Sequence, residues 1–197
     1  MSADGVDVGR RRFLTGATSV VGATGAGFAA VPFVASFQPS ERAWAIGAPV
    51  EQDVDKLEPG ALLTVKWRGQ PVWIVRRTEE SLAALPSLDE QLRDPESGEA
   101  QQPAYAQNAH RSIKPEFLIL VGLCTHLGCS PTYRPDLAAA DLGADWKGGF
   151  FCPCHGSKFD MAGRVYAGVP APTNLVVPPH SYLSDARVII GVDQETA

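Results

Sequence analysis

The chain has 197 residues, of which 45% are hydrophobic and 20% are charged, and its formal net charge is −5. This length and composition predict one modest domain with a packed core, plus an extension. The excess of acidic over basic residues, and the lack of a run of clustered Lys and Arg residues, argue against nucleic acid as a partner.

Residues 1–12 are polar and end in arginine, and the chain then continues with Phe13 and Leu14. Two arginines ahead of x-Phe-Leu resemble the twin-arginine export signal, in which Arg10 and Arg11 would form the pair. That export route carries folded proteins. The alternative interpretation is an ordinary basic flank of a membrane helix.

Residues 13–37 form a run of 25 residues without a charge. Because a helix of about 20 residues spans a bilayer, the run predicts a transmembrane anchor. The arginines before it, with little positive charge after it, place the N-terminus in the cytoplasm and the rest of the chain outside. A cleaved signal peptide with Ala43-Trp44-Ala45 as its site is the alternative, but its apolar core would be unusually long.

Residues 38–50 are predicted to be a flexible hinge linker, because Pro39, Gly47 and Pro49 break regular structure. A fixed connector is the alternative.

Residues 51–197 are predicted to form the folded head. The segments 62–67 and 72–76 predict a β-hairpin, and the continuous apolar run 117–121 predicts a buried strand. Residues 79–115 are more polar and predict a surface excursion with a short helix. Short strands separated by Gly/Pro turns predict a mainly β head made of antiparallel sheets.

All four cysteines lie in two short segments, Cys124-Thr-His-Leu-Gly-Cys129 and Cys152-Pro-Cys-His155. Because 25 residues separate His126 from Cys152, each segment can form its own loop and the two can face each other. Each loop offers one imidazole and two thiols. The six groups are more than one tetrahedral metal ion can use.

Several kinds of site use such residues. Two disulfides would leave the histidines as bystanders, and four cysteines allow three full pairings. A structural zinc site with two Cys and two His ligands would leave two cysteines unexplained. A c-type haem needs Cys-x-x-Cys-His, and the segment Cys152–His155 is one residue too short for it.

Cys124, His126, Cys152 and His155 match the ligand pattern of Rieske proteins, and the chain resembles that family in this respect. The pattern is Cys-x-His, then a long insert, then Cys-x-x-His. In a Rieske 2Fe–2S cluster, two thiolates hold one iron and two imidazoles hold the other. Spacing alone leaves open which cysteine of each loop is a ligand. The resemblance implies a disulfide between Cys129 and Cys154, and hence an oxidising compartment. Rieske ferredoxins that serve dioxygenases normally lack this second pair.

The resemblance also implies roles for neighbouring residues. Each histidine ligand keeps one ring nitrogen free, and His155 rather than His126 is expected to hydrogen-bond a quinol. Ser157 matches a family serine whose hydroxyl bonds a bridging sulfide. Phe159 stands where many relatives have a tyrosine whose hydroxyl bonds a cysteine ligand, so that donor is missing here.

Leu127 and Gly128 match family positions that shield the cluster and let the chain turn. Residues 168–172 match a proline-rich segment that covers a third side of the cluster. The implied fold is a Rieske-type head of antiparallel sheets, with a small cluster-binding part at about 122–172.

Taken together, these segments resemble the Rieske subunits of bacterial ubiquinol–cytochrome c reductases, the cytochrome bc complexes. The resemblance implies an oxidoreductase subunit that takes one electron and one proton from quinol and passes the electron to a c-type cytochrome. Its partners would be a cytochrome b subunit, a membrane-anchored c-type cytochrome, the lipid bilayer and a second complex in a dimer. The location would be the bacterial inner membrane, with the head in the periplasm. Two alternatives stay open, a Rieske subunit of arsenite oxidase and a zinc-binding structural module.

Overall fold

The computed structural model describes residue 5 and residues 7–193. It divides into two units, residues 1–45 and residues 46–197, and each unit is described by itself.

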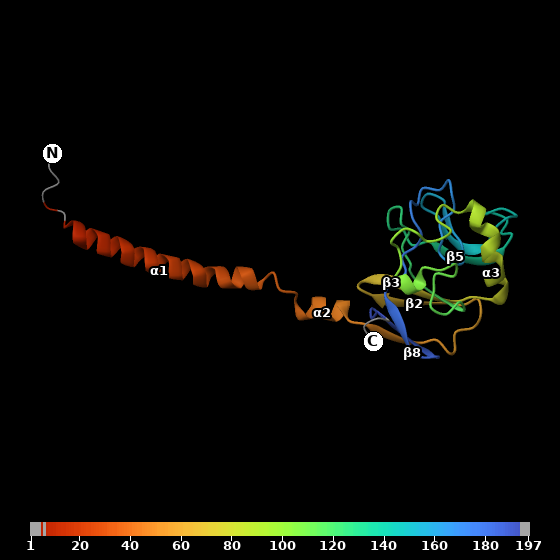
Figure 1. Ribbon diagram of the computed structural model, residues 1–197, viewed down its shortest axis with the longest axis horizontal. Coiled ribbons are helices and arrows are strands. Elements are labelled where there is room, and N and C mark those ends of the chain that lie inside the picture. The colour runs from red at the N-terminus through yellow and green to blue at the C-terminus, as the bar shows by residue number, and fades with distance from the viewer. Residues whose placement is uncertain (1–4, 6, 194–197) are drawn as a thin grey trace. The chain divides into compact units, whose positions relative to one another are not determined.

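The first unit is built on helix α1 (Val8–Ala35), which Figure 1 shows. The helix is 28 residues long and buries no side chain within the protein. The helix begins before the predicted apolar run because the side chain of Asp7 caps it, accepting a hydrogen bond of 3.1 Å from the amide N of Arg10. Within the described part of the chain, α1 is the one helix long and apolar enough to cross a membrane. Pro32 lies inside the helix, in its last turn, where it cannot donate a backbone hydrogen bond to the preceding turn.

A short helix, α2 (Glu41–Gly47), lies inside the segment for which the sequence predicted no regular structure. That part of the prediction is wrong. The Oγ of Ser40 accepts a hydrogen bond of 3.2 Å from the amide N of Ala43, and this contact caps the first turn. Pro39 precedes the helix and Pro49 follows it, so neither proline interrupts it.

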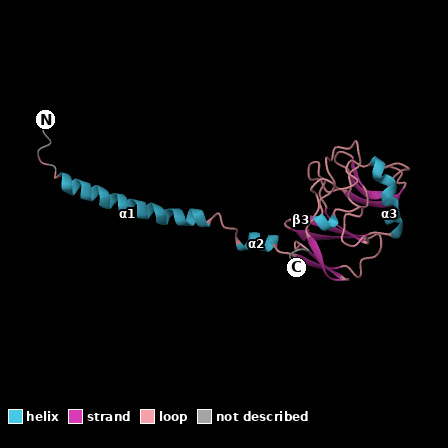
Figure 2. Cartoon of the chain, viewed as in Figure 1, coloured by secondary structure: helices cyan, strands magenta, loops and turns pink. Residues whose placement is uncertain are grey.

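Within residues 46–193, the described part of the head, the strands form three antiparallel sheets of three strands each, in the orders β1-β9-β8, β2-β3-β4 and β5-β6-β7. Figure 2 shows the strands of the head in magenta. The strands are β1 (Val50–Asp53), β2 (Leu62–Trp67), β3 (Gln70–Arg76), β4 (Phe117–Val121), β5 (Thr132–Leu137), β6 (Lys147–Cys152), β7 (Ser157–Phe159), β8 (His180–Ser184) and β9 (Arg187–Ile190). The mainly β fold predicted from the sequence is confirmed.

The predicted hairpin is β2–β3, and the predicted buried strand is β4, whose five residues are all buried. The turn between β2 and β3 uses Arg68 and Gly69 with φ of 50° and 77°, a pair of left-handed residues that suits a two-residue hairpin loop. Since side chains alternate across a strand, Ile119 points to the core shared with β9, whereas Leu120 points to the core that holds the cysteine loops.

The insert between the two cysteine loops contains β5 and the first part of β6. Gly148 and Gly149, with φ of 83° and 146°, weaken the sequence signal for a strand there. The rest of the insert packs around its own small core of Ala139, Leu142 and Trp146.

The segment 79–115 contains the short helix that the sequence predicted and is largely exposed, but parts of it are buried in the core, which the sequence did not predict. It contains α3 (Glu79–Ala84) and the 3₁₀ helices η1 (Leu85–Gln91) and η2 (Ala104–Ala106). Leu85 and Leu88 are buried, and Arg111 is completely buried. The guanidinium of Arg111 donates hydrogen bonds to backbone carbonyls of residues 162, 163 and 175, which fixes the segment to the core. Hydrophobic periodicity gives no signal for a buried arginine.

Candidate metal centre

The first cysteine loop follows the end of β4 and closes on itself. The amide N of Cys124 donates to the carbonyl of Cys129 at 2.7 Å, and the amide N of Gly128 donates to the carbonyl of Cys124 at 2.9 Å. Gly128 has φ of 79°, a left-handed conformation that favours glycine, as its predicted role in turning the chain requires.

The second cysteine loop is the hairpin turn between β6 and β7. Cys152 is the last residue of β6 and pairs with Ser157, the first residue of β7. The amide N of Gly156 donates to the carbonyl of Cys152 at 2.9 Å, and Gly156 has φ of 77°. The register of one hairpin therefore fixes where Cys154 and His155 are presented.

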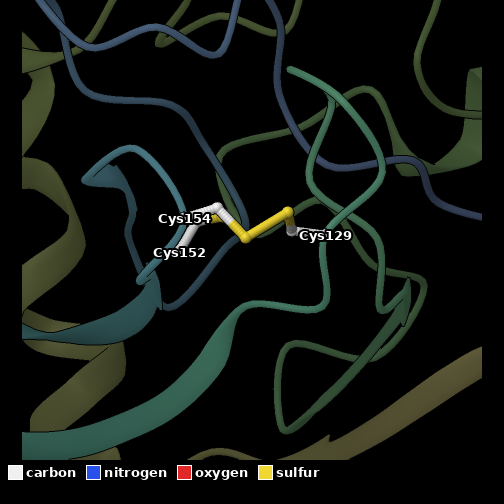
Figure 3. A group of neighbouring side chains, drawn as sticks. All are labelled: Cys129, Cys152 and Cys154. Carbon is white, nitrogen blue, oxygen red and sulfur yellow. A yellow bond between two sulfur atoms is a disulfide. The ribbon is translucent and has the colours of Figure 1, made fainter.

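A disulfide between Cys129 and Cys154 joins the two loops, as the resemblance implied (Figure 3). The other two cysteines, Cys124 and Cys152, are free thiols with exposed fractions of only 3% and 2%. Both belong to the same hydrophobic core as Trp73.

The sulfur atoms of Cys129, Cys152 and Cys154 all lie within 4.8 Å of one another (Figure 3). This trio is close enough to surround a metal ion, but two of its members are bonded to each other. Because the thiolate is the form that binds metals, a disulfide sulfur is not an equivalent ligand. The available donors of the two loops are therefore the free thiols and the imidazoles.

The rings of His126 and His155 meet across the two loops, with centroids 4.7 Å apart and an interplanar angle of 85°. His155 is exposed and His126 is half-buried. Leu127, next to them, has an exposed fraction of 72%. The thiols thus lie inside and the imidazoles lie at the surface.

Burial raises the pKa of the Cys124 thiol, the neighbouring Cys152 raises it further, and the hydroxyl of Ser157 opposes the shift. The Cys124 thiol therefore favours the protonated form until a cation displaces the proton, which is how metal binding releases protons. Two buried thiols with two surface imidazoles match the Cys₂His₂ donor set of a Rieske cluster. A tetrahedral zinc site uses the same set.

The proline-rich segment 168–172 and Thr173, which follows it, are tied to the two loops. The Oγ of Ser157 accepts a hydrogen bond of 3.0 Å from the amide N of Ala171, and the Oγ1 of Thr125 donates one of 2.7 Å to the carbonyl of Thr173. Sequence reasoning gave Thr125 no role, although its place between two candidate ligands was a signal. Phe159, completely buried, adds no polar atom to the site.

Arg10 and Arg11 belong to the first unit, on the first turns of α1. The other predicted site residues all lie in or beside the two loops of the head.

Comparison with known proteins separates iron–sulfur from zinc chemistry. Residues 96–179 match the family model described as "Rieske [2Fe-2S] domain", and residues 1–40 match "Ubiquitinol-cytochrome C reductase Fe-S subunit TAT signal". The site is therefore that of a Rieske 2Fe–2S cluster, and the zinc and arsenite oxidase alternatives are not favoured.

Relatives match over the whole chain. The ubiquinol–cytochrome c reductase iron–sulfur subunit of Allochromatium vinosum is 65% identical over 100% of this chain and 95% of its own length. The subunit of the same description from Rhodospirillum rubrum is 40% identical over 96% of each chain. A chain of the solved structure "Hyperthermophilic respiratory Complex III" is 28% identical, with a TM-score of 0.49, over 90% of this chain and 98% of that one.

Because relatives of this description match the chain over nearly their whole length, the chain belongs to the Rieske iron–sulfur subunits of ubiquinol–cytochrome c reductase, the electron-transfer subunits of respiratory complex III.

Proposed function

We propose that Cys124 and Cys152 hold one iron of the 2Fe–2S cluster and that His126 and His155 hold the other. The observation that carries the proposal is the division of the donors, with two buried free thiols beneath two surface imidazoles. Neutral imidazoles in place of thiolates make such a cluster less negative, and Rieske centres accordingly have potentials of about −150 to +300 mV.

The surface position of His155 supports its role as the contact with quinol. When bound, the cluster supplies a one-electron acceptor. The ring nitrogen of His155 that does not face the metal accepts a hydrogen bond from the quinol hydroxyl and then its proton. His126, half-buried in the other loop, presents a second such nitrogen. The exposed side chain of Leu127 keeps apolar surface beside the rings and excludes water from the contact.

The head would carry electrons from one partner protein to another. We infer that it receives them at a cytochrome b subunit that binds quinol and delivers them to a membrane-anchored c-type cytochrome, within a dimeric complex. Membership of respiratory complex III supports both partners.

We also infer the arrangement along the chain: residues 1–12 on the cytoplasmic side with Arg10 and Arg11 as the export signal, 13–37 across the bilayer, 38–50 as a hinge, and 51–197 as the periplasmic head. The match to the export-signal family and the apolar surface of α1 support this arrangement.

A redox titration followed by EPR, on the full chain in detergent, tests the proposal. A Rieske-type signal at a clearly positive potential supports quinol oxidation. A signal at a clearly negative potential would instead indicate a ferredoxin-like carrier. Absence of an iron signal from correctly matured protein would overturn the ligand assignment. Cys124→Ser and His126→Ala should each abolish the signal.

A further inference from the structure

The interior of the head holds more positive than negative side chains. Among the residues that the structure describes, the almost completely buried charged side chains are those of Arg77, Arg111, Arg164 and Asp160, with exposed fractions of 2%, 0%, 1% and 0%. Arg164 is paired with Asp160 and with the more exposed Asp89. The buried carboxylate therefore offsets one of three buried guanidiniums, and an excess of positive charge remains inside.

Arg77 and Arg111 are held by neutral groups. Arg77 donates to the backbone carbonyls of residues 110, 115 and 161 and to the hydroxyl of Ser112. Arg111 donates to the carbonyls of residues 162, 163 and 175 and to the amide oxygen of Gln102. Burial lowers the pKa of each guanidinium to about 10, and the charge of Asp160 opposes the shift, so both stay protonated at neutral pH. Neutral acceptors satisfy the donors without cancelling the charge.

The guanidiniums border the core that contains the two free thiols. That core includes Cys124 and Cys152 and also three residues whose carbonyls accept from the arginines, which are Met161, Ala162 and Leu175. Apolar side chains fill the space between the charges and the thiols, so little water is available to screen one from the other.

The chain limits how far Arg111 can lie from the metal centre. Its Nη2 is 2.7 Å from the carbonyl oxygen of Leu175, and the carbonyl oxygen of Thr173 is 2.7 Å from the Oγ1 of Thr125. Since two residues of chain span at most about 7 Å, the guanidinium lies within about 13 Å of the Thr125 hydroxyl. Thr125 stands between two of the proposed ligands.

We propose that the buried charge of Arg111 raises the midpoint potential of the cluster. Reduction adds one negative charge to the cluster, and a fixed cation in a medium of low polarity stabilises that charge. The carboxylate of Asp160 acts in the opposite direction. The inference rests on the proposed function and deepens it, because the potential sets how readily the cluster accepts an electron from quinol.

The expected size follows from Coulomb's law. With an effective dielectric constant of about 20, one elementary charge at about 12–25 Å changes the equilibrium constant for reduction about three- to tenfold. For a one-electron couple this is about 30–60 mV.

Redox titration by EPR of the full chain in detergent, at an ionic strength of about 0.1 M, tests the proposal. Arg111→Gln removes the charge, whereas Arg111→Lys keeps it. Both variants lose the fork of the guanidinium, so altered packing would affect both. We expect Arg111→Gln to lower the equilibrium constant for reduction about three- to tenfold and Arg111→Lys to stay close to the wild type.

A second variant should shift the potential in the opposite direction. Asp160→Asn keeps the size of the side chain and an oxygen for the amide N–H groups of residues 162 and 164, but it removes the negative charge. It should raise the equilibrium constant for reduction by a similar factor. Arg187→Gln is the control, because Arg187 lies at the surface with half of its side chain exposed, where water and salt screen it. Its potential should equal that of the wild type.

Equal shifts in Arg111→Gln and Arg111→Lys would overturn the proposal, because packing rather than charge would then explain them. So would an unchanged potential in Arg111→Gln, or a lower one in Asp160→Asn. If the Arg111 variants do not give the circular dichroism spectrum of the wild type, the sign of the shift in Asp160→Asn decides. The EPR signal of the wild type tests the proposed cluster, and the differences between variants test the charge, so the two failures are distinguishable.

Discussion

The Oγ of Ser157 accepts a hydrogen bond of 3.0 Å from the amide N of Ala171, inside the protein. The hydroxyl keeps its own hydrogen for a further contact, and it lies beside the thiol of Cys124, whose pKa it lowers against the larger effect of burial. One buried side chain thus joins the second loop, the proline-rich segment and a sulfur atom.

Replacement of Ser157 by Ala should lower the midpoint potential of the cluster. Reduction adds negative charge to the sulfur atoms, and a hydroxyl donor stabilises that charge. A hydrogen bond to a charged group contributes about 1.5–3 kcal/mol, which is about 65–130 mV for one electron. Redox titration by EPR measures the shift. Ser87→Ala, at an exposed position of η1, is the control and should leave the potential unchanged. A potential equal to that of the wild type in Ser157→Ala would contradict the role.

The opposite change is expected at Phe159. This side chain is completely buried in the core that also contains Cys124 and Cys152. Phe159→Tyr adds a hydroxyl at the position where the family resemblance implies one, and it should raise the potential by about 20–65 mV if the hydroxyl makes an ordinary hydrogen bond to a ligand sulfur. The same titration measures it, and an unchanged or lower potential would rule out the missing-donor explanation.

The chemistry of the site could be predicted from the sequence because it depends on local order. The hydrogen bonds of each cysteine loop join residues within six positions of one another, as between Cys124 and Cys129 or between Cys152 and Gly156. By contrast, the support of the site comes from contacts distant in sequence, such as Arg111 with Leu175. Neither hydrophobic periodicity nor turn composition signals a buried cation that pairs with backbone carbonyls.

The strands next to the cysteine loops show the same contrast between local and distant signals. Residues 117–121 are uniformly apolar, and the predicted strand is observed there. The strand β6 contains Gly148 and Gly149, and its formation depends on pairing with β5 and β7 on both sides. Tertiary pairing overrides weak local propensity in that part of the chain.

The hydroxyl of Thr125 should hold the proline-rich segment in place. Thr125→Val keeps the shape of the side chain but removes the donor of the 2.7 Å bond to the carbonyl of Thr173. The loss of one hydrogen bond costs about 1 kcal/mol, and this corresponds to a fall of about 2–4 °C in melting temperature for a domain of this size. The loss of visible absorbance on heating measures it.

The matched control is Thr64→Val, which makes the same change on an exposed position of β2. Equal melting temperatures for the two variants would show that the contact between Thr125 and Thr173 does not stabilise the centre.

The ion pair between Asp160 and Arg164 lies within the fold, with the Nε of Arg164 2.8 Å from a carboxylate oxygen of Asp160. Both side chains are buried, and the same carboxylate accepts the amide N–H groups of Ala162 and Arg164. Removing one partner of a buried pair costs about 3–5 kcal/mol, because the remaining charge stays buried. Asp160→Ala should therefore strongly destabilise the head.

Urea unfolding of the full chain in detergent measures the loss. Asp141→Ala is the control, since Asp141 forms a salt bridge with Arg134 at the surface, where water and salt screen the pair. The midpoint should fall clearly for Asp160→Ala and stay close to that of the wild type for Asp141→Ala. Similar midpoints for the two variants would show that the buried pair is not a main support of the turn after β7.

His180 should make the stability of the head depend on pH. Its ring is almost completely buried, its Nδ1 lies 2.8 Å from the carbonyl of Pro178, and burial lowers its pKa below the ordinary value. Because the carbonyl only accepts, the neutral ring with a proton on Nδ1 satisfies this contact. The unfolded chain binds a further proton as the pH falls below about 6.5, whereas the folded chain resists it.

The stabilisation by neutral His180 is therefore fully present above about pH 6.5 and is lost as the pH falls toward the lowered pKa, by at most about 1.4 kcal/mol per pH unit. His180→Asn keeps a donor near the carbonyl of Pro178 but does not titrate. The variant should be less stable than the wild type at about pH 8, yet it should lose less stability between about pH 8 and pH 5. Urea unfolding of both proteins across this range measures the difference, and contributions from the cluster ligands cancel because they are common to both. Parallel stability curves would show that His180 binds no additional proton on unfolding, which would contradict the effect of its burial.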